Sequence, residues 1–176
     1  MTNKDEKDPV ERMVDAYERM LEYVDDVIGK AEKTTLPTLR KSLDAAREKA
    51  VELNELTREE AEKIATYIER DIKEAAHYLV ETGDEFRAWF RFDVKLIEGR
   101  LMEMFASVAD RTRLELERFA NQAREATVYR TGEVTGPGTL VCNQCGKELH
   151  FHKAGHIPPC SKCHGTTYRR GIDSAS

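Results

Sequence analysis

Cys142-Asn143-Gln144-Cys145 and Cys160-Ser161-Lys162-Cys163 are the stretches that decide the fold of this chain, and they hold all 4 of its cysteines. Each C-x-x-C pair lets two thiolates converge on one ion from a tight turn. The loop of residues 146–159 is long enough for a short hairpin that brings the second pair round to complete a tetrahedron. The spacing therefore predicts a closed tetrathiolate site holding one structural Zn²⁺ per chain. Its predicted ligands are Cys142, Cys145, Cys160 and Cys163.

Two alternatives to zinc follow from the same cysteines. Iron in a rubredoxin-like site uses the same four-sulfur geometry, which leaves an iron redox protein as a remote alternative. Two disulfides are the other alternative. The first twelve residues, MTNKDEKDPVER, contain no apolar run typical of a signal peptide, and no stretch approaches the ~20 apolar residues that cross a bilayer. We therefore expect a cytoplasmic protein without membrane contact, whose thiols stay reduced and bind metal.

The rest of the chain is helical in pattern. Charged residues make up 35% of the sequence, with only 10 Gly and 5 Pro, which indicates long amphipathic helices. Apolar residues recur at steps of three and four in four segments, at about 9–33, 37–54, 57–83 and 85–126. The last would be on the order of 60 Å long as one helix. The second and third helices, if nearly collinear, would together have about the same length.

These lengths predict a mainly α fold, in which a long antiparallel helical hairpin or bundle with a coiled-coil-like seam precedes a small C-terminal β zinc ribbon. A compact four-helix bundle is the alternative. The predicted boundaries are a disordered N-terminus at 1–8, a helical domain at 9–127, a ribbon at 128–171 and a disordered tail at 172–176.

Helix ends and helix faces are also readable. Asp8 can cap the first helix, Thr57 and Glu60 form a capping box for the third, and Gly83 ends it. The inward face of the second helix is predicted to hold Leu39, Leu43, Ala46, Ala50 and Leu53.

The ribbon is predicted from alternating segments at 139–141, 148–152 and 166–170. Gly146 directly follows the first cysteine pair, as a tight knuckle requires. After the second pair the order is His164-Gly165, so the glycine comes one place late and the geometry of that turn is open. A ligand role for His164 is the less favoured alternative, because four cysteines already complete the shell.

A non-enzymatic interaction protein is the leading hypothesis for function. The helical body has more apolar seam than one hairpin can bury, which predicts a homodimer or a protein partner bound through the helices. Catalysis is poorly supported, because four cysteines leave no open coordination position. Residues 128–176 carry 6 Lys+Arg against 3 Asp+Glu, so a nucleic-acid-binding regulator is the alternative. The candidate contact residues are Lys147, Phe151, Lys153, Lys162, Tyr168, Arg169 and Arg170.

The segment 129–145, Y-R-T-G-E-V-T-G-P-G-T-L-V-C-N-Q-C, resembles a family of uncharacterised bacterial zinc-ribbon proteins, the YbeL-like group. The cysteine motif is shared by many zinc ribbons, so the specific part of the resemblance is the pattern G-E-V-x-G-x-G-x-L-x-C at residues 132–142. Segments 55–58, 110–115 and 160–163 are also similar to the family, so the resemblance covers most of the chain. It implies a helical N-terminal region, a C-terminal ribbon and a cytoplasmic setting, and it supplies no established activity. His164-Gly165 departs from the family's more usual Cys-Gly ending of the second knuckle.

Overall fold

The computed structural model describes residues 8–30, 36–82, 103–104, 108 and 127–171. Within these ranges three long helices come first: α1 (Pro9–Lys30), α2 (Leu36–Glu52) and α3 (Arg58–Thr82). Short strands follow: β1 (Tyr129–Arg130), β2 (Val134–Thr135), β3 (Gly138–Cys142), β4 (Glu148–Phe151), β5 (Gly155–His156) and β6 (Thr167–Arg170). The described part is thus a mixed helix and sheet structure rather than the mainly α fold that the sequence indicated.

Three predictions fall outside the described ranges. Most of the fourth helical segment, 85–126, lies there, and so do nearly all of the N-terminus at 1–8 and the tail at 172–176. The long hairpin that depends on the fourth segment therefore stays a prediction. Met104 and Val108 are described, and both are buried in the same apolar cluster as the helices.

The helix ends follow the sequence. Val10 N–H donates to Asp8 Oδ1 at 3.2 Å, which satisfies one of the free amides at the start of α1. At α3 the capping box is confirmed: Glu60 N–H donates to Thr57 Oγ1 at 3.1 Å, and Thr57 N–H donates to Glu60 Oε2 at 2.9 Å. Asn54 follows α2 with a φ of 55°, the left-handed conformation in which a helix commonly ends.

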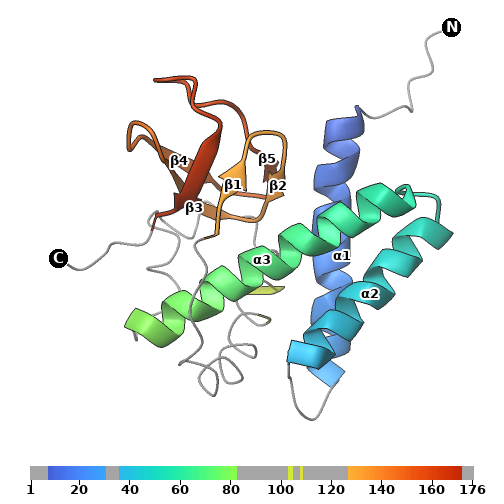
Figure 1. The fold of residues 1–176 in the computed structure, drawn as a ribbon. Coiled ribbons are helices and arrows are strands. Elements are labelled where there is room, and N and C mark those ends of the chain that lie inside the picture. The colour runs from blue at the N-terminus through green and yellow to red at the C-terminus, as the bar shows by residue number, and fades with distance from the viewer. Residues whose placement is uncertain (1–7, 31–35, 83–102, 105–107, 109–126, 172–176) are drawn as a thin grey trace, which may run out of the picture.

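The helices α2 and α3 lie side by side and antiparallel, so the expected collinear arrangement is wrong (Figure 1). Arg40 near the start of α2 pairs with Glu69 of α3 at 3.2 Å, and Arg58 at the start of α3 approaches Glu48 at 3.4 Å. The left-handed turn at Asn54 reverses the chain. The helix α1 packs against both of the others.

The helical core contains most of the predicted stripe. On α2, Leu39, Leu43, Ala46 and Ala50 are at most 4% exposed. Leu53 is 58% exposed, which corrects its predicted inward position. The reason is that α2 ends at Glu52, so Leu53 already belongs to the turn, and Leu56 enters the core instead. No helix in the described ranges combines the length and apolar character that a membrane crossing needs.

The ribbon contains two antiparallel sheets. One has the strand order β1-β6-β3-β4, and β2 pairs with β5 in the other. In the first sheet, Cys142 of β3 lies opposite Tyr168 of β6, and Leu140 lies opposite Arg170. The buried core of the ribbon is small and includes its two inner cysteines. It consists of Tyr129, Leu140, Cys142, Ile157, Cys160 and Tyr168.

The ribbon docks directly on the helices (Figure 1), because β2 contacts α1 and α3 while β5 contacts α1. Val134 of β2 and Ala154 just before β5 are buried in the same apolar cluster as the helix side chains. The sequence predicted a boundary between helices and ribbon near residue 127, but it did not indicate that the two parts pack against each other.

Candidate metal centre

The four cysteine sulfurs converge on one point, with all their Sγ atoms within 4.8 Å of one another. The Cys142 and Cys163 sulfurs lie 3.6 Å apart, and so do those of Cys145 and Cys160. A tetrahedron of thiolates at a Zn–S distance of about 2.3 Å has S–S edges of roughly 3.8 Å. The sulfur cluster therefore fits one zinc ion. These cysteines would hold it in a closed shell of four thiolates.

The two knuckles have the same backbone hydrogen bonds, although their sequences differ. Gly146 N–H donates to the Cys142 carbonyl at 3.0 Å, and His164 N–H donates to the Cys160 carbonyl at 2.8 Å. The corresponding φ angles are 75° for Gly146 and 62° for His164. His164 thus adopts the left-handed conformation that glycine adopts in the first knuckle. Its side chain is exposed and outside the sulfur cluster.

The structure explains why the glycine of the second knuckle, Gly165, comes one position later than Gly146 does in the first. A Cβ built on Gly165 would lie 3.2 Å from the sulfurs of Cys142 and Cys163, and 3.1 Å from Gln144 Oε1. Those approaches are tighter than ordinary van der Waals contact. Gly165 is needed for space beside the sulfurs, while His164 accepts the unusual backbone angle.

Backbone amides favour the charged form of two thiols. The N–H groups of Cys163 and Lys162 donate to the Cys160 sulfur and lower the pKa of that thiol to about 6. The Cys145 N–H likewise holds the pKa of Cys142 below its ordinary value. At Cys163 the Gly165 N–H acts in the same direction, but burial and the neighbouring thiols together raise the pKa to about 12. The cluster is arranged for thiolates whose mutual repulsion a cation must offset.

The comparisons with known proteins agree with this geometry. The family model described as "Zinc-ribbon containing domain" matches residues 26–171. The chain belongs to this zinc-ribbon family. It is also 31% identical over 133 residues to the uncharacterised protein YbeL of Escherichia coli strain K12, covering 73% of this chain and 79% of that protein. The YbeL sequences of strains CFT073 and O157:H7 match equally well. No solved structure matches the chain.

The candidate contact residues of this zinc-ribbon protein divide into two groups. The side chains of Lys147, Lys153, Lys162 and Arg169 are exposed, and Phe151 is partly buried. Tyr168 and Arg170 are 1% and 5% exposed, so their predicted place on a contact surface is corrected. Alternation along β6 explains the difference, because Arg169 faces solvent while its neighbours on either side face inward.

Arg170 belongs to a buried cluster of charged and aromatic side chains between the ribbon and the helices. At its centre is Asp71 of α3, whose side chain is fully buried. Asp71 Oδ1 accepts a hydrogen bond from Arg70 Nε at 3.1 Å and forms an ion pair with Arg170 Nη2 at 3.2 Å. Asp71 Oδ2 accepts from the Tyr17 hydroxyl at 2.5 Å and from Gly136 N–H at 2.8 Å. One carboxylate therefore joins α1, α3, β6 and the turn before β3.

The arginines of this cluster have further partners. Arg70 pairs with Glu133 at 2.5 Å and donates to the Val134 carbonyl at 3.0 Å. Arg170 Nε donates to the Tyr129 hydroxyl at 3.0 Å. The two guanidinium carbons lie 4.0 and 4.8 Å from the Tyr129 ring centroid, within the range of cation–π attraction. The charges are therefore paired and hydrogen-bonded, as burial requires.

The cluster also changes the acidity of its tyrosines. Burial, together with the charge and hydrogen bond of Asp71, raises the pKa of Tyr17 well above its usual value. Burial likewise raises the pKa of Tyr129. Both phenols therefore remain protonated, and the Tyr17 hydroxyl acts as the donor to Asp71.

Sequence reasoning missed this cluster, although one signal was available. Asp71 comes three residues after Ile68 and four before Ala75, on the apolar stripe of α3. A charged residue on a buried helix face needs a charged or polar partner. The sequence gives no indication of which one, because Arg170 is far away along the chain.

Proposed function

We propose that this protein is a non-enzymatic, zinc-binding scaffold that self-associates through its helices, with the ribbon as a structural element. The observation that carries the first part is the closed shell of four converging sulfurs. A catalytic zinc keeps a coordination position for water or substrate, and four thiolates supply none. Zinc in this position serves to hold together a ribbon whose apolar core is very small.

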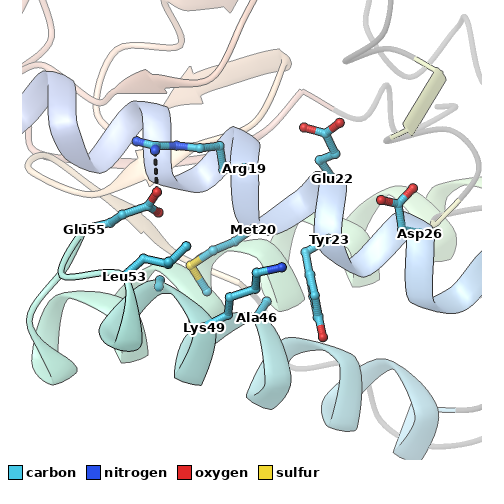
Figure 2. A pocket seen from close by; sticks show the side chains of 10 residues that line it. Arg19, Met20, Glu22, Tyr23, Asp26, Ala46, Lys49, Leu53 and Glu55 are labelled. Atoms are coloured by element: carbon cyan, nitrogen blue, oxygen red, sulfur yellow. Dashed lines mark hydrogen bonds and ion pairs between the residues drawn. The ribbon is translucent and has the colours of Figure 1, made fainter.

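A groove between α1 and α2 supports the second part (Figure 2). Its volume is about 230 Å³, and its floor includes the apolar side chains of Met20, Ala46 and Ala50. Leu53 stands at the edge of the groove with 58% of its surface exposed. An exposed leucine beside an apolar hollow is a feature of surfaces that bind other proteins.

A second copy of the chain is the occupant that we propose. Leu53 lies at the groove. If two copies meet with their grooves facing each other across a two-fold axis, each Leu53 can contact the groove of the other copy. The rim carries both signs of charge: Arg19 pairs with Glu55 at 2.6 Å, and Lys49 and Asp26 also line it. A rim of mixed sign can complement itself across a two-fold axis.

Light scattering after size-exclusion chromatography tests this, with zinc-loaded protein over a range of concentrations. We expect a mass that approaches twice 20.1 kDa, and a return to the monomer mass in a Leu53→Glu variant. Val10→Glu is the matched control, because Val10 is also exposed and lies outside the groove. A wild-type protein that stays monomeric throughout would refute self-association.

Nucleic-acid binding by the ribbon is the second candidate. The observation in its favour is that Lys147, Lys162 and Arg169 are exposed close to the knuckles, and Arg169 approaches Asn143 Oδ1 at 3.3 Å. The burial of Tyr168 removes an aromatic group that would stack on bases. Binding to single-stranded DNA that weakens with salt and with Arg169→Ala would support this candidate, and no binding at low salt would remove it.

Elemental analysis of protein purified without added metal identifies which metal the four cysteines bind. One zinc per chain is the expected result. One iron per chain would favour the rubredoxin-like redox protein instead, because the same four-sulfur geometry accepts iron.

A further inference from the structure

Asp71 and Arg170 form the ionic link between the helices and the metal-binding ribbon. Both side chains are almost completely buried, with exposures of 0% and 2%. Removing one member of a buried pair leaves an uncompensated charge, which makes a partly separated state unfavourable. The two residues are therefore expected either to stay together in the docked arrangement or to separate fully into water.

The position of Arg170 is set by the strand that also borders the metal centre. At the start of β6, the Thr167 carbonyl accepts Asn143 N–H at 3.1 Å, inside the first knuckle. The next residue, Tyr168, lies opposite Cys142, and its hydroxyl donates to the Pro158 carbonyl at 2.8 Å. Arg170 is two residues farther along the same strand and faces the same side. Any disorder in the knuckles is thereby transmitted to Arg170.

The strand β6 pairs with β1 and β3, but the apolar core that supports this sheet is small. Two of the residues in its small buried core are the cysteines Cys142 and Cys160. A core of this size does not normally fold without metal or disulfides. Loss of the metal is therefore expected to loosen the whole sheet, including β6 and the arginine that it carries.

We propose that the metal centre controls the docking of α1 and α3 on the ribbon through the Arg170–Asp71 ion pair. With metal bound, β6 holds Arg170 against Asp71, and the Tyr17 hydroxyl joins α1 to the same carboxylate. Without metal, Arg170 leaves, and the faces of α1 and α3 that pack on the ribbon open to solvent. The inference does not depend on self-association.

Hydrogen exchange of the full chain, with zinc bound and after removal of zinc by a strong chelator, tests the coupling. We expect chelation to speed amide exchange in residues 14–24 and 64–75 by about tenfold, within the usual range for coupled sites. In an Arg170→Met variant the exchange should already be fast with zinc bound. Arg130→Met is the matched control on the neighbouring strand β1, because the Arg130 side chain is exposed, and it should behave like the wild-type protein.

Linkage supplies an independent readout. If zinc favours docking by some factor, docking favours zinc binding by the same factor, so a variant that docks less well must bind zinc more weakly. Competition with a chromophoric chelator should show weaker zinc binding for Arg170→Met than for Arg130→Met. Should Arg170→Met fail to fold, Tyr17→Phe removes only one hydrogen bond to Asp71 and should weaken zinc binding in the same direction.

Two results would overturn the inference. One is exchange in α1 and α3 that chelation leaves unchanged while the ribbon amides become fast. The other is a folded Arg170→Met or Tyr17→Phe variant whose zinc affinity equals that of Arg130→Met.

Discussion

Replacing Asp71 by asparagine should destabilise the protein severely. The side chain keeps its shape, but the charge opposite Arg70 and Arg170 is lost, and the Arg170 side chain is only 2% exposed. The amide oxygen can still accept from the Tyr17 hydroxyl or Gly136 N–H. Removing one partner from a buried ion pair costs about 3–5 kcal/mol, because the remaining charge stays out of water.

The assay is thermal and urea unfolding of zinc-loaded protein, followed by circular dichroism. At about 2–4 °C per kcal/mol for a chain of this size, the melting temperature should fall by roughly 6–20 °C. Glu59→Gln is the control, since it breaks the exposed ion pair with Lys63 on the same helix and should change stability by less than about 1 kcal/mol. If Asp71→Asn unfolds within 1 kcal/mol of the wild type, the assignment of Asp71 as a buried ionic link is wrong.

Three further predictions concern local geometry. His164→Gly should raise stability by about 1 kcal/mol in chemical unfolding, because glycine adopts the φ of 62° without strain. Gly165→Ala should weaken zinc binding by about tenfold in chelator competition, since its Cβ would lie 3.2 Å from the Cys142 sulfur; unchanged affinity would contradict the crowding argument. Thr57→Ala should cost about 1 kcal/mol by removing the cap that Glu60 N–H uses, whereas Thr57→Ser should be nearly neutral.

The metal ligands and the helix ends were predictable because they depend on residues close together in the sequence. The C-x-x-C spacing fixes which sulfurs converge, and the Thr57 and Glu60 pattern fixes where α3 begins. The position of the second glycine was readable as a departure from the first knuckle. Its explanation needed coordinates, because the space beside the sulfurs at Gly165 depends on the opposite knuckle.

Errors arose where a residue's environment depends on how elements pack. The periodicity of α2 placed Leu53 inward, but the helix ends one residue earlier and the turn exposes it. The basic character of the ribbon suggested Arg170 as a surface contact, and pairing with Asp71 places it in the interior. Collinear second and third helices were expected, and the left-handed turn at Asn54 reverses the chain instead.

By itself the sequence determined the metal-binding ribbon, because four thiolates at this spacing form a tetrahedral site, and it determined the amphipathic helices through their apolar repeats. Only the tertiary structure decided how the two parts are joined. Tyr17, Asp71 and Arg170 meet at one buried carboxylate although they are far apart along the chain. Periodicity tells which face of an element is buried, but the partner of a buried charge is set by the packing of distant elements.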